Sequence, residues 1–223
     1  NPPQEKTIDS FILNGVECEP YLTCDHRLML EKAEEIIQGA KIIKKILNAS
    51  CCYLAIEKNK PDAIKLMKKK IKKEEGFYLR ELAVKYPQGA EKQLIKTLLA
   101  REVPSGGLPL DVGVVVNNVG TALAVYEAVA ESKPLYERVI TVTGSIIRNP
   151  QNLRVRIGTK FSHLIKECGG FTREPAKIIM GGPMMGLAQY SLDAPIIKGT
   201  CGIVALGKEE MTSFKSNPCL RCG

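Results

Sequence analysis

Two cysteines near the end of the chain have the spacing of metal ligands. Cys219 and Cys222 follow Pro218 and are separated by Leu220 and Arg221. This spacing begins the run of cysteines that ligates a [4Fe–4S] cluster, although a zinc site can begin in the same way. The sequence ends before a third ligand. We therefore expect this stretch alone to hold no complete cluster.

Polar segments that contain glycine follow three apolar runs typical of strands. The first segment spans Asn14–Pro20, the second Tyr86–Glu91 and the third Asn117–Thr121. In open α/β sheets, ligands bind where strands end and helices begin. Glycine allows close approach of the backbone, and the amide, carboxylate and hydroxyl groups suit a flat heterocycle with a ribose or ribityl chain. From spacing alone, ordinary turn and helix-cap chemistry is an equal alternative.

The sequence does not contain a complete set of residues for other catalytic chemistries. His26 and His163 are the two histidines, and both are expected to be surface or capping residues rather than bases. Neither a Walker loop nor a G-x-G-x-x-G motif follows the first expected strand, and the glycines at 181–186 are typical of turns. The sequence therefore offers no hydrolytic or phosphate-loop site.

Strands and helices alternate over the first part of the chain. Apolar runs predict strands at 8–13, 52–56, 77–84 and 112–116, and helical spacing predicts helices at 29–47, 61–73, 90–100 and 121–130. Thr23 and Asn59 are expected helix starts, and Asn48 is an expected stop. This alternation predicts a mainly parallel sheet covered on both faces. We assign residues 1–136 to a Rossmann-like α/β domain.

The pattern changes after Pro134. Short strands are expected at 138–143, 153–157, 178–180 and 203–206, with one helix at 161–167. A small sheet crossed by one helix is an α+β unit of the β-grasp kind, which we place at residues 137–207. Residues 208–223 are expected to begin a helix that leads into the cysteine segment.

Composition limits the class of protein. Hydrophobic residues make up 44% and charged residues 25%, which is ordinary for a globular protein. The stretch 112–126, which no uncharged stretch of the chain exceeds in length, is too short and polar to span a bilayer. The cysteines outside the last motif are expected to be free, buried thiols. Free thiols favour a reducing, cytoplasmic compartment. The lysine run 65–73 indicates a solvated helix face or a contact with anionic lipid or an acidic redox partner. Without interleaved aromatic residues, it does not favour nucleic acid.

Four separated motifs occur in one order along the chain. They are Asn14–Pro20 with the following Asp25-His26-Arg27, then Tyr86–Glu91, Val103–Pro109 and Asn117–Thr121. Together they resemble the C subunit of the Rnf ion-translocating electron transport complex. The same segments are similar, more distantly, to the flavin-carrying NADH-binding subunit of respiratory complex I. In this more distant comparison, Val16, Ala90 and Gly120 replace acidic residues.

The resemblance implies a Rossmann-like domain for FMN and NADH, an SLBB-type β-grasp domain and [4Fe–4S] clusters. The motifs imply that the flavin is lined by Asn14, Glu17 and Cys18. Its ring or chain would lie near Tyr86 and Gly89, and its ribityl phosphate near Asn117, Asn118 and Thr121. Those implied for the nicotinamide nucleotide are Glu19 and Glu91. The implied iron ligands are Cys219 and Cys222.

The implied activity is that of an NADH-dependent oxidoreductase subunit of the ion-translocating, ferredoxin:NAD type. Hydride would pass between NAD(H) and FMN, and electrons would pass to [4Fe–4S] clusters, coupled to ion movement in other subunits. The resemblance places the protein peripherally on the cytoplasmic face of the bacterial membrane. Its implied partners are the other subunits, NADH and, indirectly, ferredoxin; a transmembrane segment of its own and nucleic acid are not expected.

Two other functions fit the same residues. A non-catalytic docking module would use the small domain and the lysine run to bind partner subunits. A soluble β-grasp protein would bind a sugar or a cobalamin-like molecule. In the resembling family, a glycine-rich FMN loop precedes the segment that opens with Asn1. We therefore expect this stretch alone to bind little or no flavin and to be inactive.

Overall fold

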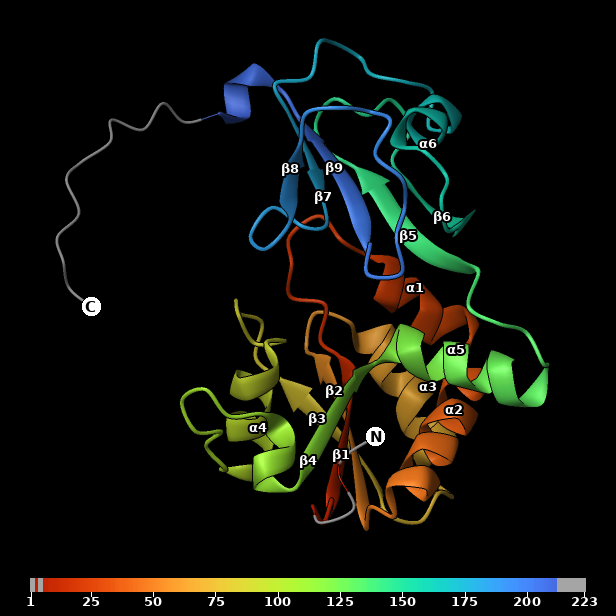
Figure 1. The fold of residues 1–223 in the computed structure, drawn as a ribbon, viewed down its shortest axis with the longest axis vertical. Coiled ribbons are helices and arrows are strands. Elements are labelled where there is room, and N and C mark those ends of the chain that lie inside the picture. The colour runs from red at the N-terminus through yellow and green to blue at the C-terminus, as the bar shows by residue number, and fades with distance from the viewer. Residues whose placement is uncertain (1–2, 4–5, 212–223) are drawn as a thin grey trace, which may run out of the picture.

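The computed structural model describes residues 3 and 6–211, which form two sheet domains joined after α5 (Figure 1). A parallel-sheet α/β domain comes first and a small α+β sheet domain follows, which confirms the predicted fold class. Among the described residues, no helix combines the length and the apolar character needed to cross a bilayer. Cys219 and Cys222 lie outside the described residues.

Within the described residues, the first domain is built on a four-stranded parallel sheet in the order β3-β2-β1-β4. The strands are β1 (Ser10–Gly15), β2 (Cys51–Glu57), β3 (Phe77–Leu82) and β4 (Val114–Asn118). The unbroken apolar runs of β1 and β2 are typical of strands buried on both faces. Because the strand order reverses between β1 and β4, their carboxyl ends flank a crevice where ligands bind in folds of this class.

Helices cover both faces of this sheet, as predicted (Figure 1). One face is covered by α1 (Cys24–Glu31), α2 (Ala33–Leu47), α3 (Pro61–Ile71) and α5 (Val119–Ala130). The other face is covered by α4 (Glu91–Leu99) and η1 (Pro109–Val112). The α2 and α5 backbones approach closely at Gly39, where an added Cβ would lie 1.8 Å from the Ala122 carbonyl oxygen. This approach fixes where α5, and with it the end of β4, lies on the sheet.

Over residues 137–211, the second domain contains a mixed five-stranded sheet in the order β6-β5-β9-β7-β8. Its elements are β5 (Glu137–Thr143), β6 (Gln151–Arg156), α6 (Phe161–Glu167), β7 (Lys177–Met180), β8 (Leu187–Gln189), β9 (Gly202–Leu206) and η2 (Lys208–Glu210). β5 and β9 pair in parallel, whereas the other neighbours are antiparallel. The buried side chains of Phe161, Leu164 and Ile165 pack α6 against this sheet. One helix against a small mixed sheet is the predicted α+β unit.

The helix boundaries correct three expectations. The helix expected at 29–47 is two helices, because the chain breaks at Lys32 between α1 and α2. Thr23 precedes α1 without capping it, since its hydroxyl bonds the Asn152 side chain of the second domain. Lys60, not Asn59, is the residue before α3. The stop at Asn48 is confirmed, with φ of 52° in the left-handed region.

Candidate functional site

A cleft of about 750 Å³ lies between the two domains at the carboxyl ends of β1 and β4. Its first wall comes from the segment after β1, the 86–90 loop before α4 and the end of β4. Its second wall comes from the β7–β8 hairpin and from residues 197–201 before β9. The cleft therefore occupies the crevice that the parallel sheet predicts, with the second domain closing its open side.

The side chain of Asn14 fastens two of the three predicted segments together. Its Nδ2 donates to the Gly89 carbonyl oxygen at 3.0 Å, and its Oδ1 accepts from the Val16 amide at 3.0 Å. The Gly89 amide in turn donates to the Cys18 sulfur at 3.3 Å. A Cβ at position 89 would lie 2.5 Å from the Val16 carbonyl oxygen, so glycine is required for this approach. The loop that carries Tyr86 is thus fixed against the end of β1.

Asn118 joins the third segment to the same place. Its Oδ1 accepts from the Gly120 amide at 2.7 Å and so caps α5. Its Nδ2 donates to Asp25 Oδ2 at 2.6 Å, which ties the beginning of α5 to the beginning of α1. The ends of β1 and β4 and the starts of two helices therefore meet at one point.

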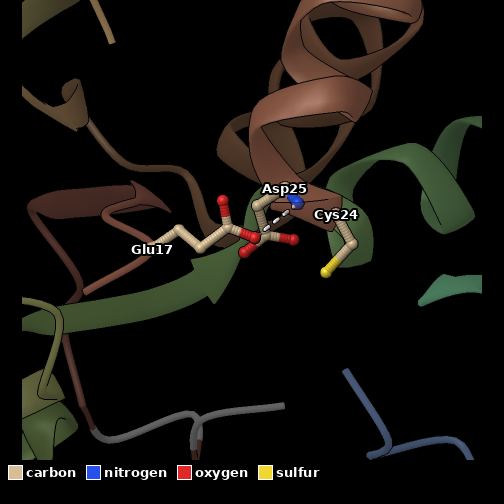
Figure 2. A group of neighbouring side chains, drawn as sticks. All are labelled: Glu17, Cys24 and Asp25. Carbon is tan, nitrogen blue, oxygen red and sulfur yellow. Dashed lines mark hydrogen bonds between the residues drawn. The ribbon is translucent and has the colours of Figure 1, made fainter. Parts of the chain in front are cut away.

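Glu17 caps α1 in place of Thr23. Its Oε1 accepts from the Asp25 amide at 2.9 Å and its Oε2 from the His26 amide at 3.3 Å. Figure 2 shows Glu17 and Asp25 side by side with the Cys24 thiol close to them. Burial, and then the charge of Asp25, raises the pKa of Glu17 to about 7. Burial also raises the pKa of Asp25, so the two carboxyl groups compete to stay charged.

The donor atoms of Glu17, Cys24 and Asp25 lie within 4.8 Å of one another. Both carboxylates accept amide hydrogen bonds, and the Cys24 thiol donates to the Cys201 carbonyl oxygen at 3.3 Å. Hydrogen bonds within the protein therefore account for this group without a metal ion.

Glu19 connects the two walls of the cleft. Its carboxylate accepts from the backbone amides of Met184 and Met185 at 3.0 and 2.8 Å. A Cβ added at Gly182 would lie 2.3 Å from Glu19 Oε2, so the hairpin can approach this carboxylate only with glycine there. The β7–β8 hairpin is thus anchored by one side chain of the first domain.

The predicted site residues fall into four groups. Those that line the cleft are Glu17, Cys18, Glu19, Tyr86, Gly89 and Asn118. Asn14 lies behind the wall and acts through its hydrogen bonds. Thr121 lines a neighbouring cavity that shares Asp25 and Asn118 with the cleft. Asn117 and Glu91 line neither space, and Glu91 is exposed in the first turn of α4.

Sequence reasoning missed the residues of the second wall. Met180, Met185 and Leu187 face the cleft from the hairpin, and Cys201 lies beside Cys24. The only local signal is the glycine cluster at 181–186, a pattern typical of turns. Asp25 belongs to one of the four motifs, but its partnership with Asn118 spans 93 positions and has no local pattern.

Comparisons with known proteins agree with this architecture. Residues 1–127 match the model of the Nuo51 FMN-binding domain, and residues 139–188 match that of the SLBB domain. The chain is 54% identical to the C subunit of the proton-translocating ferredoxin:NAD(+) oxidoreductase complex of Clostridium ljungdahlii, over 100% of this chain and 48% of that protein. It is 48% identical to the Na(+)-translocating counterpart of Acetobacterium woodii, over 99% of this chain and 50% of that protein. The chain thus spans about half the length of these relatives.

A solved structure shares the fold at lower identity. A crystal structure of NAD+-reducing [NiFe]-hydrogenase in the H2-reduced state matches with a TM-score of 0.73 and 18% identity, covering 89% of this chain and 40% of that chain. The curated relatives confirm the resemblance to the C subunit of the Rnf complex. The Nuo51 model covers more than half of the sequence. The chain therefore belongs to the Nuo51 FMN-binding domain family and continues into an SLBB domain.

Proposed function

We propose that this chain is the FMN- and NAD(H)-binding part of an electron-transport oxidoreductase subunit. The observation that carries the proposal is the convergence of the three strand-exit segments on one cleft. The Asn14–Gly89 hydrogen bond joins the first two segments, and Asn118 brings in the third. Turn chemistry alone would not require segments so far apart in sequence to share one wall.

The cleft fits a flavin in size and character. Its volume of about 750 Å³ lies in the range of ligand sites, which is roughly 300–1,000 Å³. The half-exposed ring of Tyr86 and the methionines of the opposite wall offer apolar faces, whereas Glu17 and Asn118 offer polar edges. We assign Glu17, Cys18, Tyr86 and Gly89 to the ring, Asn118 and Thr121 to the ribityl phosphate, and Glu19 to the nicotinamide nucleotide.

FMN, when bound, would take up hydride from NADH and release electrons singly. The protein's own residues orient the two rings and exclude water. Asn14 and Asn118 hold the loops in place, and the hairpin of the second domain covers the cleft. The Glu17 carboxyl, whose pKa burial raises to about 7, is partly protonated near neutral pH beside the position assigned to the ring.

The proposal extends to the whole protein. Residues 1–136 form the nucleotide domain, residues 137–207 the SLBB domain and residues 208–223 the beginning of an iron–sulfur segment ligated through Cys219 and Cys222. Electrons would pass through [4Fe–4S] clusters to the other subunits, with ferredoxin reached indirectly and ion movement coupled there. The protein would lie on the cytoplasmic face of the membrane.

The test is flavin titration of the intact protein, followed by NADH-dependent ferricyanide reduction. We expect Asn118→Ala to weaken FMN binding and lower turnover about 10- to 100-fold, because it removes a cap and leaves Asp25 without its amide partner. Asn149→Ala, at an exposed turn of the second domain, is the matched control. Wild-type turnover in Asn118→Ala would contradict the proposal.

A docking module is the second candidate, favoured by the lysine side of α3. Lys65, Lys68 and Lys69 are exposed, whereas Lys70 pairs with Glu34 at 3.0 Å. Reversing the three exposed charges would separate the two functions. Loss of assembly with the partner subunits at unchanged ferricyanide reduction would identify a docking surface. Unchanged assembly would identify a solvated helix face.

A further inference from the structure

A second cavity, of about 610 Å³, adjoins the cleft, and of the residues assigned to the ligand above it contains Asn118 and Thr121. It shares Asp25, Asn118, Gly199 and Cys201 with the cleft, so the two spaces have a common wall. The first turn of α5 lies on one side of the cavity, and the beginning of β5 lies on the other. A ligand that fills the cleft can therefore extend into this space past Asn118.

Arg138, at the beginning of β5, brings an unsatisfied donor to this cavity. Its Nε is buried and has no hydrogen-bond partner in the part of the chain that the structure describes. Buried donors in native proteins are nearly always paired, and leaving one unpaired costs about 1–3 kcal/mol. Arg138 is also one of the residues that line the cavity, so an acceptor for its guanidinium would enter through this space.

The nearby carboxylates do not supply that acceptor. Among residues 3 and 6–211, no carboxylate forms an ion pair with Arg138. Lys133 already pairs with Glu127 at 2.9 Å and with Glu137 at 2.8 Å, the two other acids of the cavity wall. Asp25 binds the Asn118 amide instead. Burial raises the pKa of Asp25, whereas the Asn118 hydrogen bond and then the charge of Arg138 act to lower it, so Asp25 and Arg138 interact through their charges without a direct ion pair.

The opposite side of the cavity also favours an anion. α5 has 12 residues and begins at Val119, with Gly120 and Thr121 in its first turn at the cavity. The N-terminus of a helix carries partial positive charge and unpaired amides. Two further cations, Arg154 and Lys198, line the same space, with Arg154 also reaching Glu137 at 3.4 Å.

We propose that Arg138 binds the phosphoryl group of the nucleotide held in the cleft, opposite the N-terminus of α5. Guanidinium and phosphate form paired, charge-assisted hydrogen bonds. The inference rests on the function proposed for the cleft, and it gives the second domain a direct part in nucleotide binding. The phosphoryl group could be that of FMN or one from the dinucleotide.

The test compares ligand pairs that differ only in phosphate, using the intact protein. Dissociation constants of FMN and riboflavin, and of ADP and adenosine, are measured for the wild type, Arg138→Gln and Arg138→Lys. We expect Arg138→Gln to weaken the phosphorylated member of one pair about 10- to 100-fold and to leave its partner nearly unchanged. Arg138→Lys should restore part of the loss. Arg156→Gln is the matched control, because Arg156 is exposed on the adjacent strand and lines neither cavity.

Each outcome decides the inference. If Arg138→Gln lowers the preference for FMN over riboflavin, Arg138 binds the flavin phosphate. If it lowers the preference for ADP over adenosine, Arg138 binds a phosphate of the dinucleotide. Equal weakening of both members of each pair would show a structural role and overturn the inference. An unchanged preference, or a wild type with no preference for phosphate, would overturn it as well. If the wild type binds neither FMN nor riboflavin but shows an ADP preference that depends on Arg138, the flavin proposal alone is refuted.

Discussion

The two walls of the cleft are built in different ways. Side-chain hydrogen bonds to backbone groups hold the wall from the parallel-sheet domain, through Asn14, Glu17 and Asn118. The hairpin wall from the second domain instead presents Met180 and Met185 to the cleft, and the exposed fraction of Met185 is 76%. The first wall is preorganised, whereas flexible methionines can adapt to what the first wall holds. The comparison teaches that the first domain shapes the cleft and that the hairpin of the second domain covers it.

The difference follows from what lies behind each wall. The loops of the first wall leave strands that are buried between two layers of helices. The β7–β8 hairpin lies at one edge of its sheet, and its second strand, β8, has only three residues. Changes to the first wall should therefore cost global stability, and changes to the second should act locally.

The largest effect is expected for Asn14→Ala. This change removes two partly buried hydrogen bonds and leaves the Gly89 carbonyl and the Val16 amide unpaired. We expect the free energy of unfolding to fall by about 2–3 kcal/mol, as measured by urea denaturation. Asn149→Ala, at an exposed turn of the second domain, should stay within about 0.5 kcal/mol of the wild type. An equally small loss for Asn14→Ala would show that the first wall is not fixed by this side chain.

A pH dependence of intermediate size is expected from Glu17. Burial raises its pKa in the folded protein from 4.5 to about 7. Between these values the folded state binds more protons than the unfolded state, so stability falls as the pH rises through this window. We expect a loss of about 1–3 kcal/mol between the two ends of the window.

Urea denaturation at several pH values measures this loss. Glu17→Gln should flatten the dependence, because glutamine keeps acceptor capacity but does not titrate. Glu81→Gln, at an exposed position of β3, should keep the wild-type dependence. If the stability of Glu17→Gln changed with pH as steeply as that of the wild type, the carboxyl pair of the first wall would not be buried as the structure has it.

The sequence predicted the first wall better than the second for a physical reason. Apolar runs and glycine-containing exits are local patterns, and they located the parallel strands and the segments that follow them. The break at Lys32 escaped prediction because Met29 and Ala33 are both buried, so the apolar periodicity continues across the break. The hairpin wall depends on a contact between Glu19 and Met184 across 165 positions, for which no local pattern exists. The roles of individual site residues stay predictions.

The smallest effect is expected for Glu19→Gln, which tests the second wall directly. Glutamine keeps an acceptor oxygen but removes the charge that strengthens the bonds to the Met184 and Met185 amides. A loss of about 1 kcal/mol should speed amide exchange at these two positions about fivefold, without a change in global stability. Hydrogen exchange read at single residues makes the measurement.

The result decides whether the two walls are independent. Glu81→Gln, which removes the same charge from an edge strand of the first domain, should leave exchange in the hairpin unchanged. If Glu19→Gln also speeds exchange at Gly89 or Asn118, the hairpin stabilises the first wall, and preorganisation would be a property of both domains together. If only the hairpin responds, the second domain closes over a site that the first domain has already shaped.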